Sequence, residues 1–118
     1  MKKFDHEKLE VYKASIEFVA AANMVIQSLP RGKSYLTDQL QRAAASIPLN
    51  IAEGAGEFSP KEKARFYRMA RRSATECAAI FDVCVSLELV TVEDISEPRE
   101  ALLKIVAMLV GLIKPKNQ

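Results

Sequence analysis

The sequence predicts an all-α protein folded as an antiparallel, up-down-up-down four-helix bundle. Apolar residues recur at every third or fourth position over long segments, which is the period of a helix that buries one face. Short connectors separate these segments, and the first two connectors contain proline or glycine. The whole chain, 1–118, is expected to be one domain, because 118 residues with 49% hydrophobic content can bury a core without disulfides or metal.

The overall composition limits the classes of function. A net charge of +2 excludes a strongly basic nucleic-acid arm, so any basic site must come from local clustering. Cys77 and Cys84 lie on one predicted helix, roughly 10 Å apart along its axis, which is too far for a disulfide. Both are expected to be buried. No apolar signal segment or membrane-spanning run is found, so we expect a cytoplasmic protein without membrane contact.

The first helix is predicted over residues 7–29 and carries two apolar stripes. The first stripe has the 3-4-3-4-3 spacing of a bundle seam and comprises Leu9, Tyr12, Ile16, Val19, Asn23 and Ile26. The second stripe comprises Val11, Ser15, Phe18, Ala22, Val25 and Leu29. The stripes lie more than about 100° apart, so the second is either a very wide part of the core or a subunit interface, which we favour. Asn23 would specify register or assembly, or face a polar gap in the core.

The second helix is predicted over residues 35–54, with Ser34 or Thr37 as its cap. Pro48 lies inside this helix and is expected to kink it, because proline lacks the N–H that would bond to the carbonyl four residues earlier. Gly54 and Gly56 are expected to end the helix. Its core residues are predicted to be Leu36, Leu40, Ala43, Ile47 and Ile51.

The third helix is predicted over residues 60–89. Ser59 is expected to be its N-cap, with Pro60 in the first turn and Glu62 completing a capping box. Many residues on its apolar face are small, so a neighbouring helix can approach closely. That face comprises Phe66, Ala70, Ser73, Cys77, Ile80, Cys84 and Leu87.

The fourth helix is predicted over residues 92–114. Thr91 and Asp94 form a second capping pattern, but Pro98 leaves two alternatives open. Either the helix begins after Thr91 and is strained at Pro98, or it restarts with Glu97 as the cap. The seam of this helix is predicted to be Leu102, Ile105, Leu109 and Leu112.

An unusual block, Ser-Ile-Pro-Leu-Asn-Ile-Ala-Glu-Gly, runs from Ser46 to Gly54. Further characteristic segments are Phe4, Leu9–Ala14, Leu36–Ala44, Phe66–Ser73 with Glu76, and Leu87–Val90. Together these segments resemble the bacterial four-helix-bundle proteins called 23S rRNA intervening-sequence proteins, over nearly the whole chain. The interrupting Pro98 and the short C-terminal tail depart from the pattern of that family.

This resemblance implies a subunit of a ring-shaped homopentamer. A related branch of the family comprises the accessory variability proteins of diversity-generating retroelements, which bind reverse transcriptase and nucleic acid. The partners implied for this chain are therefore further copies of itself, RNA or DNA, and a reverse transcriptase or another protein. The resemblance does not assign a biochemical role.

One face of the third predicted helix is strongly basic. Lys61, Arg65, Arg68 and Arg72 fall within about 60° of one another by helical geometry, flanked by Lys63 and Arg71. We define the basic stripe as Lys61, Arg65, Arg68, Arg71 and Arg72. Guanidinium groups at this pitch could bind successive phosphates. The alternative is a solvated face, or ion pairs with Glu76 and with carboxylates of other helices.

A second polar group comprises Arg42, Ser46, Asn50 and Glu53 on the second predicted helix. It is either a ligand pocket or, as we favour, a structural network that satisfies carbonyls freed near Pro48 while Glu53 pairs with an arginine of the third helix. His6 is the only histidine, and no zinc, di-iron or phosphate-loop spacing is present. The sequence thus favours a non-catalytic nucleic-acid-binding oligomer without metal or cofactor. The alternative is a scaffold that docks a protein partner.

Overall fold

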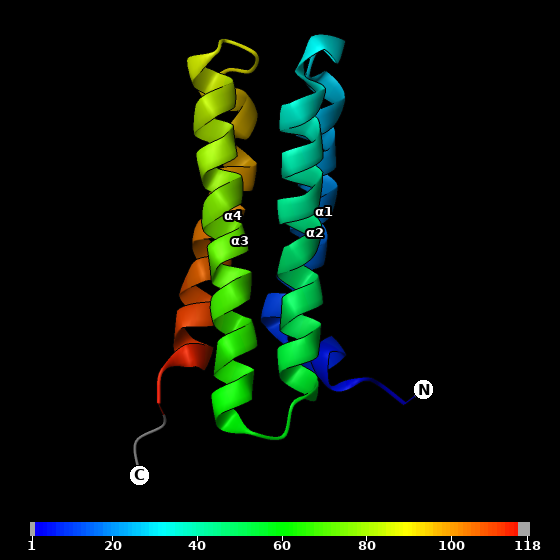
Figure 1. Cartoon of the computed structure of the whole chain (residues 1–118), viewed down its shortest axis with the longest axis vertical. Helices are drawn as coiled ribbons and strands as arrows, with labels where there is room; N and C mark the ends of the chain where they lie inside the picture. Colours follow the sequence, from blue (N-terminus) through cyan, green and yellow to red (C-terminus); the bar gives the residue numbers. More distant parts are fainter. Residues whose placement is uncertain (1, 116–118) are drawn as a thin grey trace.

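The computed structural model describes residues 2–115, and these residues fold into a four-helix bundle (Figure 1). The long helices are α1 (Glu10–Ser28), α2 (Ser34–Gly56), α3 (Pro60–Ser86) and α4 (Val92–Ile113). Two short 3-10 turns, η1 (Asp5–Lys8) and η2 (Arg31–Lys33), precede α1 and α2. Within this described part of the chain, no helix is long and apolar enough to cross a membrane.

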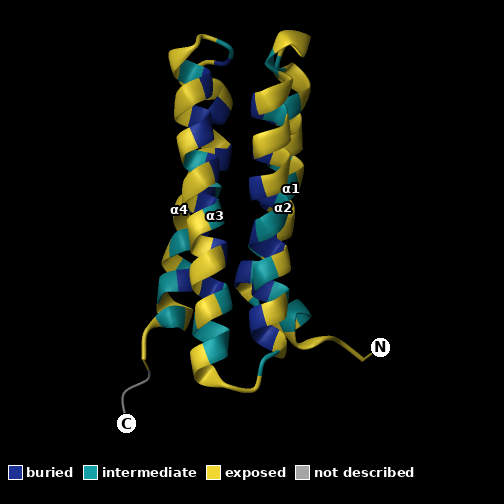
Figure 2. Ribbon diagram, in the orientation of Figure 1, coloured by how far each residue is buried: buried dark blue, intermediate teal, exposed yellow. Residues whose placement is uncertain are grey.

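Successive helices run in opposite directions, so the bundle has the predicted up-down-up-down order (Figure 1). Each helix packs on two neighbours: α1 and α3 both contact α2 and α4. Large side chains fill the space between the diagonal helices. Phe18 of α1 and Phe81 of α3 meet edge to face, with ring centroids 6.2 Å apart. Buried residues accordingly line the inner faces of the helices (Figure 2).

The structure places the second stripe of α1, rather than the first, at the centre of the core. The second stripe forms the core, because Val11, Ser15, Phe18, Ala22 and Val25 are all buried. The first stripe lies along the edge of α1: Ile16 is 46% exposed and Asn23 is exposed. Asn23 therefore lies neither in a buried seam nor in a polar gap of the core, and its role in assembly stays a prediction. Both stripes have nearly the same spacing, so only packing against α2 and α4 distinguishes them.

Helix α2 buries all five predicted core residues and continues through Pro48, which is itself buried. The bend at Pro48 stays a prediction. Neither Ser34 nor Thr37 caps the helix, since Ser34 already has helical backbone angles and Lys33 stands at the N-cap without a side-chain hydrogen bond. The helix also continues to Gly56 rather than stopping at Gly54.

Gly54 allows close packing between helices and does not end α2. No glycine in residues 2–115 has a positive φ, so neither Gly54 nor Gly56 forms the left-handed turn that commonly ends a helix. A Cβ added at Gly54 would lie 2.7 Å from Cε1 of Tyr67 on α3. The missing side chain therefore lets the Tyr67 ring approach the backbone of α2.

Helix α3 begins as predicted, with the Ser59 hydroxyl accepting from the Glu62 N–H at 3.3 Å and Pro60 in the first turn. The capping box is incomplete, because the Glu62 carboxylate binds Arg65 instead of the backbone. The buried face comprises Tyr67, Ala70, Ala74, Cys77, Ile80, Phe81 and Cys84. The predicted Leu87 is 46% exposed. Burial, together with the charge of Glu76, raises the pKa of the Cys77 thiol to about 12.

Helix α3 ends at Ser86, earlier than predicted, in a turn at Glu88. Glu88 has φ 59°, and the Leu89 N–H donates to the Cys84 carbonyl at 2.9 Å. The Glu88 N–H donates to the Val85 carbonyl at 2.9 Å, so the two bonds form a Schellman motif. Glycine usually occupies this left-handed position because it has no Cβ. Position 88 is a glutamate, so no glycine marks this helix end in the sequence.

We expect Glu88→Gly to raise the free energy of unfolding by about 0.5–1 kcal/mol, because glycine adopts the left-handed conformation without a Cβ clash. Urea unfolding measures the change. Glu88→Ala is the matched control, since alanine removes the carboxylate from the C-terminal end of α3 but keeps the Cβ. An equal gain in both variants would attribute it to the charge and contradict the proposed strain.

Helix α4 is continuous from Val92, so it begins after Thr91 and does not restart at Glu97. The Thr91 hydroxyl accepts from the Asp94 N–H at 3.1 Å, and the Asp94 carboxylate accepts from the Thr91 N–H at 2.9 Å. These hydrogen bonds lower the pKa of Asp94. The helix then passes unbroken through Pro98, which is buried. Leu102, Ile105 and Leu109 of the predicted seam are buried, whereas Leu112 is 40% exposed.

Candidate functional site

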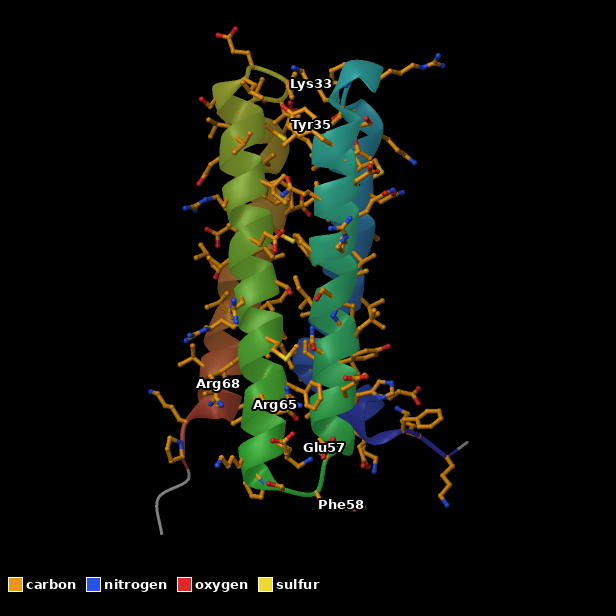
Figure 3. The ribbon with its side chains drawn as sticks, viewed as in Figure 1. Lys33, Tyr35, Glu57, Phe58, Arg65 and Arg68 are labelled. Atoms are coloured by element: carbon orange, nitrogen blue, oxygen red, sulfur yellow. The ribbon has the colours of Figure 1, made fainter. Side chains whose placement is uncertain are left out.

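The basic stripe lies on the outer surface of the N-terminal half of α3. All five of its residues are exposed, while Tyr67, Ala70 and Ala74 of the same turns are buried on the opposite side. Figure 3 shows Arg65 and Arg68 on this half of α3, with Arg68 on the side of the C-terminal end of α4. The helical spacing therefore places the stripe on the surface away from the core.

Two of the cations near the start of α3 already bind other groups of the protein. The Arg65 guanidinium pairs with the Glu62 carboxylate at 3.1 Å and lies 4.5 Å from the centre of the Phe66 ring. The Lys63 ammonium donates to the Ala55 carbonyl at 2.9 Å and to the Gly54 carbonyl at 3.4 Å. Lys63 thus neutralises the C-terminal end of α2, where carbonyls lack helical partners.

The other four residues of the basic stripe have no carboxylate partner within 4.0 Å among residues 2–115. These residues are Lys61, Arg68, Arg71 and Arg72. In particular, the expected pair between Arg72 and Glu76 is not formed, and all three ion pairs in the described chain join residues three positions apart. The stripe therefore keeps most of its positive charge available to a ligand.

Charge is unevenly distributed along the α3–α4 hairpin. Residues 60–72 contain six basic side chains and one acidic side chain, Glu62. Residues 73–100 contain seven acidic side chains and one basic side chain, Arg99. Because the two groups lie in opposite halves of α3 and its neighbour, one end of the hairpin attracts anions despite the small net charge of the chain.

The predicted polar network forms only in part. The Asn50 amide donates to the Ser46 carbonyl at 2.9 Å and to its hydroxyl at 3.1 Å. The Ser46 and Ser73 hydroxyls lie 2.9 Å apart, which joins α2 to α3. None of these bonds reaches the carbonyl of Ala44, which Pro48 leaves without its helical partner.

The charged members of that predicted network remain on the surface. Arg42, Glu53 and Glu76 are exposed and form no ion pair within residues 2–115. All four predicted residues nevertheless line one shallow pocket of about 380 Å³ on the outer face of α2, and its use by a ligand stays a prediction. The network therefore consists of Ser46, Asn50 and Ser73.

His6 lies in η1 among aromatic rings. Its ring centroid is 5.6 Å from that of Phe4 and 4.6 Å from that of Tyr12. No group of three His, Cys, Asp or Glu side chains in residues 2–115 could hold a metal ion. His6 therefore packs against both Phe4 and Tyr12.

Lys114 is a basic residue near the stripe that the sequence alone did not single out. It follows the last residue of α4 and lines a pocket with Lys61 and Arg68 of α3. The signal that could have found it is the antiparallel order, which brings the end of α4 beside the start of α3. In sequence, these cations are separated by more than half the length of α3 and all of α4.

Comparisons with known proteins agree with this architecture. The family model described as 23S rRNA-intervening sequence protein matches residues 7–111. A crystal structure of a protein of unknown function from the S23 ribosomal protein family of Bacteroides thetaiotaomicron is similar, with a TM-score of 0.83 and 21% identity. That match covers 89% of this chain and 99% of the other.

At that identity the structural likeness supports the fold alone. No curated protein matches this chain. The family model, by contrast, spans nearly the whole bundle, from η1 to the last turn of α4. The chain therefore belongs to the 23S rRNA-intervening sequence protein family.

Proposed function

We propose that this protein is a non-catalytic, homo-oligomeric bundle that binds nucleic acid, with RNA as the expected ligand, through the basic stripe of α3. The carrying observation is that Lys61, Arg68, Arg71 and Arg72 are exposed without a carboxylate partner in residues 2–115. Arginine binds phosphate oxygens through its planar fork of donors. The stripe spans about 16 Å along α3, which is the length of several nucleotides of one strand.

Oligomerisation would multiply this surface. Several large apolar side chains of the outer surface are available for contacts between copies, among them Ile16 and Met24 of α1 and Val92 of α4. The basic and acidic halves of the α3–α4 hairpin are also complementary to each other. A pentamer is the size that the family resemblance implies, and each added subunit would repeat the stripe and increase avidity. Light scattering tests this part, since a stable monomer would contradict it.

The nucleic-acid part is tested by charge reversal. We expect Arg71→Glu/Arg72→Glu to weaken binding of a structured RNA at least about tenfold at low salt, because two phosphate contacts become repulsive. Binding of the unchanged protein should also weaken steeply as salt rises, with a slope set by the number of neutralised phosphates. Fluorescence anisotropy over a salt series measures both effects.

The matched control carries the same change in charge at the opposite end of the molecule. Arg31 and Lys33 lie in η2, and Figure 3 shows Lys33 far from Arg65 and Arg68. Arg31→Glu/Lys33→Glu should therefore bind nearly as the unchanged protein does. Equal weakening in both variants would show that binding depends on net charge. No binding of RNA or DNA at low salt would contradict the proposal.

A protein partner is the outcome that would replace nucleic acid. A scaffold that docks a reverse transcriptase or another protein would bind its partner after nuclease treatment, and would not require Arg71 and Arg72. Co-purification of the two variants with and without nuclease separates these cases. Retained partner binding in Arg71→Glu/Arg72→Glu, together with no RNA binding, would favour the scaffold.

A further inference from the structure

A pocket of about 900 Å³ lies between the beginning of α3 and the end of α4. It is lined by Pro60, Lys61, Lys63, Ala64, Tyr67, Arg68, Leu112, Ile113, Lys114 and Pro115. Pockets of this size accommodate small organic ligands. The lining contains four basic side chains and no acidic side chain, so the pocket favours an anion.

Three of those cations are available to a ligand. The Lys63 ammonium already binds the last carbonyls of α2. Lys61, Arg68 and Lys114 are exposed and have no carboxylate within 4.0 Å among residues 2–115. They come from the first turns of α3 and from the residue that follows α4, and they border one pocket, which is the arrangement that binds a phosphate from more than one direction.

The remaining lining is apolar. Leu112 is 40% exposed, and Ala64, Ile113 and the two prolines add further apolar surface. Tyr67 is 5% exposed, and its hydroxyl forms no hydrogen bond within residues 2–115. Since no buried side-chain oxygen is left unpartnered there, that hydroxyl keeps contact with solvent. The pocket thus combines anion-binding groups with an apolar surface and one free hydroxyl.

We infer that this pocket binds one unpaired nucleotide of a nucleic-acid strand. Lys61, Arg68 and Lys114 bind its phosphate, and the base lies against Leu112 and Ile113. This inference rests on the proposed function, because Lys61 and Arg68 belong to both the basic stripe and the pocket. A strand that follows the stripe toward the start of α3 therefore reaches the pocket without a break in positive charge. The ligand class is RNA with a single-stranded end or bulge, in preference to a blunt duplex.

The chemistry of the lining selects a nucleotide over simpler ligands. A free inorganic anion would leave the apolar surface unused, and a neutral apolar ligand would leave the three cations without a counter-charge. A nucleotide uses both, because its base has a flat face for apolar contacts and its phosphate accepts charged hydrogen bonds. A base inside a duplex is stacked and paired, so it cannot enter without being exposed first.

The test compares a blunt RNA duplex with the same duplex carrying a short single-stranded overhang. The unchanged protein is expected to bind the overhang form about tenfold more tightly. In Leu112→Asp/Lys114→Glu this preference should disappear. The matched control is Leu103→Asp/Lys104→Glu, the same pair of substitutions on the outer part of α4 away from the pocket, which should keep the preference. Circular dichroism checks that both variants fold.

The outcomes separate this inference from the proposed function. Equal binding of both duplexes by the unchanged protein would overturn the pocket assignment and leave the stripe in place. Loss of the preference in both variants would overturn it as well. If neither duplex binds, the proposed function fails, and NMR titration with a mononucleotide decides the pocket separately. Shifts at Leu112 and Ile113 that vanish in Lys114→Glu would support it, whereas equal effects of inorganic phosphate would overturn it.

Discussion

Replacing Phe18 by alanine is expected to lower the free energy of unfolding by about 3–5 kcal/mol. Phe18 is 1% exposed and meets Phe81 across the bundle, so its removal leaves a cavity that the four helices cannot close by a local shift. A loss of this size is a large part of the stability of a small domain. Guanidinium unfolding followed by circular dichroism measures it.

Ile16 provides the matched control on the same helix. Ile16 belongs to the first stripe and is 46% exposed, so Ile16→Ala should cost less than about 1 kcal/mol in a single subunit. A larger loss at Ile16 than at Phe18 would show that the first stripe is the core after all. If Ile16→Ala instead changes the mass measured by light scattering without loss of helicity, the first stripe forms a subunit contact.

Gly54→Ala is expected to reduce stability by about 1–2 kcal/mol, although alanine is the better helix former by about 1 kcal/mol. The added methyl group would lie 2.7 Å from Cε1 and 3.0 Å from Cδ1 of Tyr67, and 3.1 Å from Cβ of Phe66. Relief requires the Tyr67 ring to shift toward the pocket that it lines or α2 and α3 to separate, and the contact with Cβ of Phe66 is relieved only by the second. Thermal and urea unfolding report the loss.

Gly56 distinguishes packing from helix propensity at the same end of α2. A Cβ added at Gly56 would meet nothing within 4 Å. Gly56→Ala should therefore be neutral or stabilise by up to about 1 kcal/mol. If both variants were stabilised alike, the close approach of Tyr67 to Gly54 would not limit the packing of α2 on α3. The two measurements thus test the contact that also positions Tyr67 beside the pocket.

The fold class and most of the local features can be predicted from the amino-acid pattern alone. Helical periodicity predicted the four helices, and the five core residues of α2 are buried as expected. The Thr91 cap and the Ser59 cap are local patterns whose hydrogen bonds reach only three residues along the chain. The exposure of the basic stripe also followed from sequence, because residues opposite a buried helix face must point outward.

Tertiary packing decided what periodicity leaves ambiguous. The two stripes of α1 share one spacing, and the choice between them depends on where α2 and α4 lie. The sequence around Gly54 is typical of a helix stop, whereas the folded bundle uses Gly54 for close contact with Tyr67. Periodicity does not show that Lys63 is already bound, because the carbonyls that it binds belong to α2. The antiparallel order brings Lys114 toward the start of α3, but its place in the same pocket as Lys61 depends on how α4 packs on α3. Local patterns specify a helix and its faces, whereas the partner of each face depends on contacts between residues distant in sequence, which exist only in the folded bundle.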